Sequence, residues 1–345
     1  MTRQLPASAR SAADFFCRAL SSFQSSQSKL QIICTAASSQ HRRDADHDEP
    51  TLSPPAKPPR TIVVLDSSFN PPTRAHLSMA TTAILDLAHK HNEPLSTVRL
   101  LLLLSVNNAD KSVKPAAFDK RLAMMWAFAA DVLDSVGTQA KRVPPMAAEG
   151  RRGQELPDGG EGLSVDIGLT TVPYFHEKSA LLAKERYYHG GADDLSGSRH
   201  PPPDHVFLVG YDTLIRIFNP KYYNPPSSTT PAALSGSTPM QNALDPFFGR
   251  ARLRVTLRAD DEWGGVDEQS QYLHEILHGD GLEKIGGSRD WGKRIDLVEA
   301  RSVGTDIISS TYARAAAKKR DPDRLDLMVT PGVKWWIEQE GLYAE

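Results

Sequence analysis

The chain has 345 residues, of which 40% are hydrophobic and 24% are charged, a balance typical of an ordinary globular protein. Its 40 Lys and Arg residues nearly match its 42 Asp and Glu residues, giving a net charge of -2. This balance argues against a bulk basic field for nucleic acid or for a membrane surface, so we expect neither as a partner. A polyanionic ligand would have to be held by a local site.

The cysteines and the first twenty residues bear on the compartment. Cys17 and Cys34 match no metal-ligand or redox spacing, which favours a reducing compartment, the cytoplasm or the nucleus. Three arginines against one acid in the first twenty residues are also typical of a mitochondrial transit peptide, which stays as the alternative. No apolar run approaches the roughly 18 residues of a membrane span.

The chain divides into three parts by composition. Residues 1–35 form an N-terminal extension with a predicted helix over Ala12–Phe23 and an alternating strand over Lys29–Thr35. Residues 36–60 are rich in Ser, Pro, Asp and His, which is linker composition. Residues 61–345 have the pattern of one folded domain.

Within that domain, short apolar runs alternate with segments of helical periodicity. Strands that read as unbroken apolar runs, separated by helices, indicate a parallel sheet covered on both faces, which is a doubly wound α/β fold. The last helix is predicted from an N-cap at Thr330 through Glu340. The predicted strands are Thr61–Leu65, Val98–Leu104, Val165–Thr170, His205–Gly210, Arg252–Leu257 and Arg294–Glu299.

Three polar insertions interrupt this pattern, near residues 143–162, 190–204 and 224–245, and we expect them to be surface loops. In open α/β sheets, ligands bind beyond the carboxyl ends of the strands, where the strand order reverses. The chemistry is therefore expected in the loops that directly follow strands.

The loop after the first main-domain strand spans Asp66–His76. It lacks the G-x-G-x-x-G of dinucleotide-dependent dehydrogenases, which argues against hydride transfer. A turn of small residues leads through two prolines into a helix whose first turn carries Thr73 and His76. Backbone N–H groups and the positive end of the helix dipole suit a triphosphate there. Residues three apart share a helix face, so Thr73 and His76 are expected to point together at one bound group.

Two further loops carry polar side chains suited to a nucleotide. Near the C-terminus, Ile308–Arg314 offers Ser309 or Ser310 as a helix cap, and the planar fork of the Arg314 guanidinium suits phosphate oxygens. After a central strand, Val209–Asp212 places a glycine before an aspartate.

These loops together resemble the nicotinamide mononucleotide adenylyltransferase family. Ser68–His76 is similar to the family signature G-S-F-N-P-x-[HT]-x-x-H, and Ile308–Arg314 is similar to I-S-S-T-x-x-R. The stretch from Asp66 to Pro72 is typical of a divergent fungal branch. The resemblance covers about Thr61 to Tyr343 and implies a Rossmann-like nucleotidyltransferase fold.

The resemblance also implies roles for individual residues. It assigns catalysis to His76, Thr73 and Arg314, with His76 contacting the ATP phosphates during transfer. Contact with the mononucleotide is implied for Lys111 or Lys114 and for the ring of Tyr222 or Tyr223. The implied ATP-binding residues are Ser67, Ser68, Phe69, His76, Gly210, Asp212, Ser309, Ser310, Thr311 and Arg314.

The implied reaction is adenylyl transfer from ATP to nicotinamide mononucleotide or its acid form, which yields NAD, or its acid analogue, and pyrophosphate in NAD biosynthesis. Such a transfer depends on positioning and charge stabilisation, so no nucleophilic side chain is needed. We expect Mg²⁺ to be carried by ATP and no protein-held metal, because no cluster of carboxylates presents itself. The choice of mononucleotide and the oligomeric state stay open.

Two alternatives remain. Ser67 stands where the family has glycine and Asp306 where many relatives have Asn, which fits a divergent ATP-binding protein or weak ATPase with a regulatory role. Residues 274–278 form an H-E-x-x-H match with Glu299 as a conceivable third ligand, the pattern of a zinc peptidase. The apolar residues between and around the two histidines favour an amphipathic helix instead.

Overall fold

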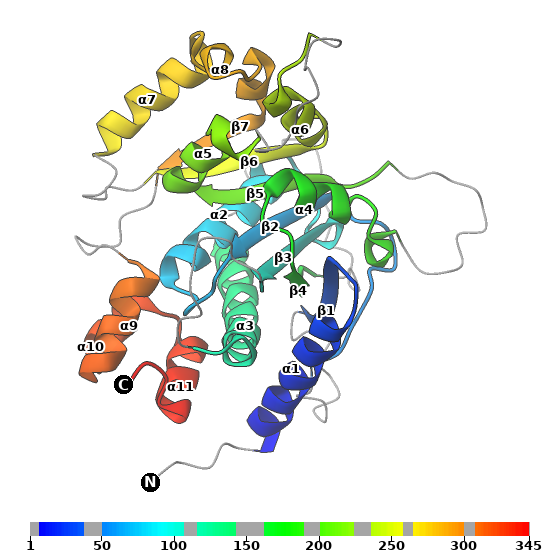
Figure 1. Cartoon of the computed structure of the whole chain (residues 1–345). Coiled ribbons are helices and arrows are strands. Elements are labelled where there is room, and N and C mark those ends of the chain that lie inside the picture. The colour runs from blue at the N-terminus through cyan, green and yellow to red at the C-terminus, as the bar shows by residue number, and fades with distance from the viewer. Residues whose placement is uncertain are drawn as a thin grey trace, which may run out of the picture.

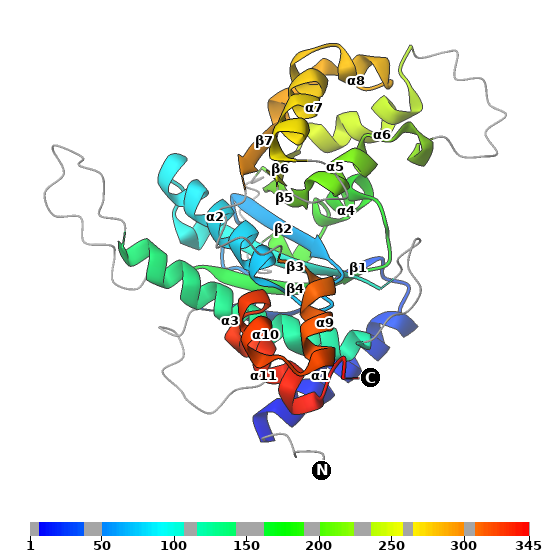
Figure 2. The same cartoon turned by 90° about the vertical axis from the view of Figure 1, so that its left-hand side faces the viewer.

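The computed structural model describes residues 7–37, 50–106, 116–142, 162–189, 201–223, 236–257, 265–299 and 308–344. Over these residues the chain forms a seven-stranded sheet with helices on both faces, as Figures 1 and 2 show. The predicted doubly wound α/β fold is confirmed.

Every strand predicted for the main domain is present, with bounds within two residues of the expected ones. The main-domain strands pair in parallel, and most of their buried residues are apolar on both sides of the sheet, apart from a few polar and charged side chains such as Arg99 and Asp166. The strands are β1 (Leu30–Ala37), β2 (Thr61–Ser67), β3 (Val98–Ser105), β4 (Ser164–Thr170), β5 (Asp204–Gly210), β6 (Ala251–Leu257) and β7 (Ile295–Glu299).

The strand order is β1-β4-β3-β2-β5-β6-β7, and it reverses between β2 and β5. From β2 the chain adds strands outward through β3 and β4, and it then crosses back to β5 and continues through β6 to β7. The crevice for a ligand in such a sheet lies at the carboxyl ends of the strands that flank the reversal. Asp66 and Ser67 end β2, and Gly210 ends β5, so these residues border that crevice.

The N-terminal extension is part of the same sheet. Its predicted helix and strand are present as α1 (Ala7–Ser25) and β1, and β1 pairs antiparallel with β4 at the sheet edge. Thr35 also bridges to Thr51, with its N–H donating to the Thr51 carbonyl at 2.8 Å. The end of the expected linker therefore lies against the extension, while residues 38–49 lie outside the described residues.

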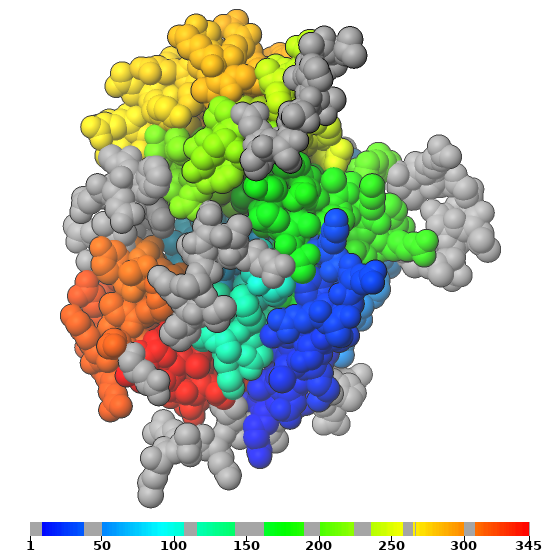
Figure 3. Space-filling view, in the orientation of Figure 1, coloured from blue at the N-terminus to red at the C-terminus, as the bar shows by residue number. Residues whose placement is uncertain are grey.

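Helices cover both faces of the sheet, and each face buries its own apolar core. One face carries α1, α2 (Arg74–Lys90), α3 (Phe118–Arg142), α9 (Ser310–Lys319), α10 (Pro322–Met328) and α11 (Pro331–Glu340). The other carries α4 (Phe175–Leu182), α5 (Tyr211–Ile217), α6 (Pro239–Phe248), α7 (Val266–His278) and α8 (Gly281–Lys284). Short 3-10 turns lie at η2 (Leu95–Thr97), η3 (Arg186–Tyr188), η4 (Pro220–Tyr222) and η5 (Arg289–Arg294). In the space-filling view, α1 (blue) and α9–α11 (orange and red) lie at one end of the molecule, away from α7 and α8 (Figure 3).

The predicted extent of one loop was partly wrong. The insertion expected over 224–245 ends earlier, because α6 begins at Pro239. Thr238 and Gln241 form a reciprocal cap: the Thr238 Oγ1 accepts from the Gln241 N–H at 3.0 Å, and the Gln241 Oε1 accepts from the Thr238 N–H at 2.9 Å. Met240 and Leu244, four residues apart, are buried on one helix face. Residues 143–161, 190–200 and 224–235 lie outside the described residues.

Within the part of the chain that the structure describes, none of the helices has the length and apolar character needed to cross a lipid bilayer.

Candidate active site

The loop between β2 and α2 holds the imidazole of His76 in a fixed orientation. Thr73, predicted to lie in the first turn of this helix, is the N-cap of α2, and its backbone N–H donates to His76 Nδ1 at 3.0 Å. The Thr73 hydroxyl oxygen lies 2.8 Å from the same nitrogen. Because Nδ1 accepts a backbone N–H, the neutral ring carries its proton on Nε2, which lies 3.0 Å from Ser67 Oγ. The ring is therefore held at both nitrogens.

Two buried residues of this loop, Thr73 and Phe69, support the His76 ring. Thr73 is 1% exposed and Phe69 is fully buried, with its ring centroid 5.6 Å from that of His76. Phe69 also has a φ of 44°, in the left-handed region, which turns the loop toward Asn70 and Pro71. Thr73 and Phe69 thus contact His76, and the whole of Phe69, backbone included, is shielded from solvent.

The C-terminal loop packs directly against this loop. Ser310 Oγ donates to the Pro71 carbonyl at 2.8 Å, and Arg314 Nη1 donates to the Asn70 carbonyl at 2.7 Å. Arg314 Nη2 also donates to Thr311 Oγ1 at 3.1 Å. The two loops predicted to share one site, from opposite ends of the domain, therefore lie together.

The cap of α9 is the remaining feature of the C-terminal loop. Ser309 is the N-cap, and its Oγ accepts from the Tyr312 N–H at 3.3 Å. The sequence left Ser309 and Ser310 open as caps, and the structure assigns the cap to Ser309. With α2 and α9 starting side by side, two helix N-termini converge on the same loop.

Asn70 anchors the base of the site, and the sequence analysis did not single it out. It is 5% exposed, and its Oδ1 accepts from the Ala116 N–H at 2.9 Å and from the Tyr343 hydroxyl at 2.8 Å. One side chain thus joins the loop between β2 and α2, the predicted phosphate loop, to the start of α3 and to the C-terminal segment.

Arg121 is a second residue that the site predictions missed. It is 6% exposed, with Nε donating to the Ala116 carbonyl at 2.7 Å and Nη1 lying 3.4 Å from the Ser68 carbonyl. Burial, together with the positive charge of Arg314, lowers the pKa of Arg121. Two guanidinium groups therefore approach the same loop, an arrangement suited to an anionic ligand. An arginine at the start of an otherwise apolar helical run was the available signal.

The start of α5 forms the other side of the crevice. Gly210 is the N-cap of α5. A Cβ at this position would lie 2.8 Å from Asp212 Oδ1, so a larger residue here would displace the Asp212 carboxylate. Arg216 Nη2 lies 3.8 Å from Asp212 Oδ2, a long contact that leaves Asp212 partly exposed.

An aromatic group follows, formed by Tyr174 and His176 near the start of α4 and by Tyr222 and Tyr223 after α5. Tyr174 stacks on His176 with centroids 5.6 Å apart and lies 6.3 Å from Tyr222. Tyr223 donates its hydroxyl to the Ile217 carbonyl at 2.6 Å, and burial raises its pKa. Tyr174 is more than a third exposed, whereas the Tyr223 hydroxyl already donates to a backbone carbonyl of the protein. The sequence had not placed Tyr174 or His176 beside the predicted tyrosines.

Lys111 and Lys114, predicted to contact the mononucleotide, lie outside the described residues. Their role stays a prediction.

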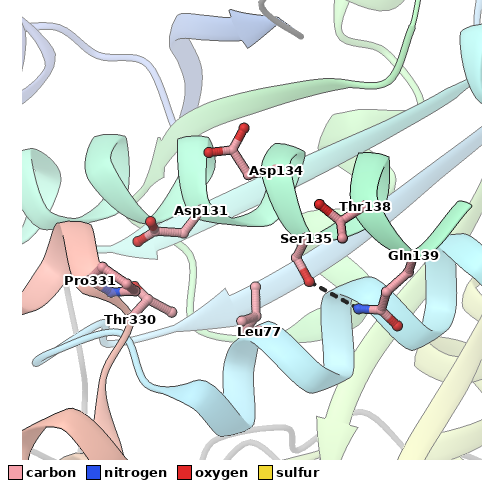
Figure 4. A pocket seen from close by; sticks show the side chains of 8 residues that line it. All are labelled: Leu77, Asp131, Asp134, Ser135, Thr138, Gln139, Thr330 and Pro331. Atoms are coloured by element: carbon pink, nitrogen blue, oxygen red, sulfur yellow. Dashed lines mark hydrogen bonds between the residues drawn. The ribbon is translucent and has the colours of Figure 1, made fainter. Parts of the chain in front are cut away.

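A separate cleft of about 650 Å³ lies between α2, α3 and the start of α11 (Figure 4). Its described lining contains none of the residues assigned to the nucleotide site, although Leu77 directly follows His76. The remaining lining residues are Asp131, Asp134, Ser135, Thr138, Gln139, Thr330 and Pro331.

The H-E-x-x-H match lies on α7, which is amphipathic as expected. Leu273 and Ile276 are buried, whereas His274 and His278 are exposed with ring centroids 4.8 Å apart. Glu299 ends β7 and is also exposed. The two histidines thus face solvent on the outer side of a helix that packs on the sheet.

We expect the double variant His274→Ala, His278→Ala to retain the activity of the wild-type protein, because both side chains are exposed and belong to α7 rather than to the loops that meet at β2 and β5. Elemental analysis of the purified protein should show no stoichiometric zinc. One zinc per chain, lost in the double variant together with activity, would show that this helix carries a metal site.

Comparison with known proteins gives one close relative. No family model matches the chain. Over 264 residues, 76% of this chain and 78% of the relative, it is 31% identical to a Schizosaccharomyces pombe protein named "Putative nicotinamide mononucleotide adenylyltransferase". This relative is fungal, in agreement with the branch that the loop sequence indicated.

Two solved structures are similar at a distance. Both are of Plasmodium falciparum nicotinic acid mononucleotide adenylyltransferase, one complexed with NaAD and one with APC. They match at 14% and 13% identity with TM-scores of 0.38 and 0.36, and each comparison covers 83% of this chain and 98% of the other. Likenesses at such TM-scores do not define a shared fold, whereas the identity to the fungal relative extends over most of both chains. The chain therefore belongs to the nicotinamide mononucleotide adenylyltransferase family of nucleotidyltransferases.

Proposed function

We propose that this protein transfers the adenylyl group of ATP to nicotinamide mononucleotide or its acid form, releasing pyrophosphate. The observation that carries the proposal is the contact between the two loops, where Ser310 and Arg314 donate to the carbonyls of Pro71 and Asn70. This contact brings two helix N-termini and the oriented imidazole of His76 to the crevice beside β2 and β5.

In this proposal the triphosphate lies across the N-termini of α2 and α9. Backbone N–H groups and hydroxyls hold its oxygens, and Arg314 adds charge-assisted hydrogen bonds. The guanidinium has five N–H donors, so it can hold the Asn70 carbonyl and a phosphate oxygen together. The residues assigned to these contacts are Ser67, Ser68, Ser309, Ser310, Thr311 and Arg314, and Phe69 stays assigned to ATP on the family resemblance alone.

His76 is assigned the role of stabilising the negative charge that develops on the leaving pyrophosphate. Its Nε2–H, which faces Ser67 Oγ in the structure, is assigned as the donor to the bridging oxygen between the α- and β-phosphates when that bond breaks. Thr73 positions the ring through Nδ1 rather than touching the substrate. A preorganised donor of this kind acts without reorganisation during the transfer.

The mononucleotide is assigned to the side of the crevice formed by α4 and α5. On the same side of the crevice, Gly210 and Asp212 stay assigned to ATP: Gly210 allows close approach of the nucleotide, and Asp212 accepts from its ribose hydroxyls. The pyridine ring stacks on the aromatic group, with Tyr222 and the exposed Tyr174 as its faces. Lys111 and Lys114 stay assigned to the mononucleotide on the family resemblance.

Mg²⁺ is assigned to the triphosphate, whose charge it neutralises when it arrives with ATP. Among the described residues no group of three or more His, Cys, Asp or Glu side chains could hold a metal ion. The carboxylate closest in sequence to the phosphate loop, Asp66, is paired with Lys178. The donor set therefore fits an ion coordinated by phosphate oxygens and water rather than one held in a protein cage.

The proposal is tested by incubating the protein with ATP and Mg²⁺, and with either nicotinamide mononucleotide or nicotinic acid mononucleotide. We expect a dinucleotide product and pyrophosphate with at least one of the two, and the faster one identifies the substrate. Orthophosphate released at the same rate with and without mononucleotide, with no dinucleotide, would instead favour the ATPase.

A further inference from the structure

A buried ion pair lies directly behind the phosphate loop. Lys178 of α4 donates to the Asp66 carboxylate at the end of β2, and the two side chains are only 3% and 8% exposed. The Lys178 ammonium also lies 5.3 Å from the centroid of the Phe175 ring. Buried charges of this kind are costly unless paired, so each member depends on the other.

The pair lies next to the residues that orient His76. Successive residues of a strand face opposite sides of the sheet. Asp66 accordingly meets Lys178 of α4 on one face, while Ser67 meets His76 of α2 on the other. Asp66 is thus one residue away from the hydroxyl that contacts the imidazole.

The same lysine is tied to the opposite half of the site. The Lys178 backbone N–H donates to the Tyr174 carbonyl at 3.0 Å, so it stands one helical turn after a member of the aromatic group. Its side chain therefore links the start of α4 to the end of β2. No role in the site had been assigned to Lys178 or Asp66 from the sequence.

The electrostatic consequence concerns ATP. A carboxylate one residue before a triphosphate-binding loop would repel the ligand, and burial weakens the screening of that repulsion. The paired ammonium cancels this charge. The positive charges of Arg121 and Arg314, on the other side of the loop, then attract the phosphates, and no unpaired Asp66 carboxylate offsets this attraction.

We propose that Lys178 is a positioning residue of the nucleotide site, which neutralises Asp66 and fixes the end of β2 so that the loop from Ser67 onward accepts a triphosphate. This inference rests on the proposed function only in taking ATP as the ligand of the loop. Lys178 touches no substrate in this proposal. It acts by balancing the charge of the Asp66 carboxylate.

The test is calorimetric binding of ATP with Mg²⁺ to the full chain, measured for a set of charge variants. Lys178→Met leaves a buried unpaired carboxylate, and we expect ATP to bind at least about tenfold more weakly. The double variant Asp66→Asn, Lys178→Met removes both charges, and ATP affinity should return to within about threefold of wild type. Asp66→Asn alone leaves the positive charge, so ATP affinity should equal or exceed that of wild type.

A matched control comes from the other end of the sheet. Arg99 and Asp166 form a second buried ion pair, near the amino ends of β3 and β4, with 8% and 0% exposed side chains. Arg99→Met breaks a pair of the same kind away from the site, so ATP affinity of the folded protein should not change. Melting temperatures of all variants separate lost binding from lost folding.

Each remaining outcome contradicts the inference. Weak ATP binding that persists in the double variant would show that Lys178 contacts the ligand directly, and unchanged binding in Lys178→Met would show that the pair is irrelevant to the site. If Lys178→Met does not fold, the double variant and Asp66→Asn decide by the same criteria. Wild-type protein that binds ATP but makes no dinucleotide would overturn the proposed function alone, whereas wild-type protein that binds no ATP would overturn both.

Discussion

His76→Ala should lower turnover by about 10²–10³-fold, the typical cost of removing one preorganised donor from a transition state. The ring is held at Nδ1 by Thr73 and at Nε2 by Ser67, so its donor is in place before the reaction. Because the charge on the bridging oxygen develops only as pyrophosphate leaves, ATP affinity should weaken far less than turnover. Measurement of kcat, ATP affinity and melting temperature for this variant separates these effects.

The control for that variant is His89→Ala, which removes an exposed histidine from the last turn of the same helix. It should leave turnover, affinity and melting temperature unchanged. Near-normal turnover in His76→Ala would remove His76 from the mechanism. A collapsed melting temperature would instead mean that its role is to hold the loop together.

Arg99→Met should lower the free energy of unfolding by about 3–5 kcal/mol, the cost of breaking a buried ion pair from one side. Arg99 Nε and Nη2 donate to the two Asp166 oxygens at 3.0 and 2.6 Å, and both side chains are buried. The hydroxyls of Tyr187 and Tyr188 also donate to Asp166. Burial raises the pKa of both tyrosines, so they remain protonated donors but cannot replace the lost positive charge.

Urea denaturation of Arg99→Met measures this loss, which is a large fraction of the roughly 5–15 kcal/mol that stabilises a typical domain. Lys293→Met is the control, because it breaks the Lys293–Asp290 pair, whose side chains are both 79% exposed. Its unfolding midpoint should match that of wild type. An unchanged midpoint in Arg99→Met would contradict the account of the Arg99–Asp166 pair.

The fold could be predicted because its signals are local. Parallel strands buried on both faces are rich in apolar runs, and Leu100–Leu104 shows this directly. A helix start could be predicted where the sequence offers a capping residue before a proline, as at Thr330 and Pro331. The start of α6 was missed although its cap at Thr238 is equally local, because the polar residues before it resemble a continuing loop.

The site was less predictable, because its key contacts join residues far apart in the chain. Nothing near Asp66 indicates a lysine 112 positions later, and only the meeting of α4 with β2 pairs them. Tyr174 and Tyr222 likewise belong to loops after different strands, and they meet only because those loops lie at the same edge of the sheet. The two phosphate loops were found because each matches a known signature, which supplies the long-range information that residue patterns lack.

In the proposed reaction the α-phosphate of ATP moves to a pyridine mononucleotide. ATP radiolabelled at its α-phosphate is incubated with the protein, Mg²⁺ and the mononucleotide, and the products are separated by chromatography. We expect the label in the dinucleotide, with one pyrophosphate released for each dinucleotide formed. Label that remains in ADP while orthophosphate accumulates would contradict the proposed reaction.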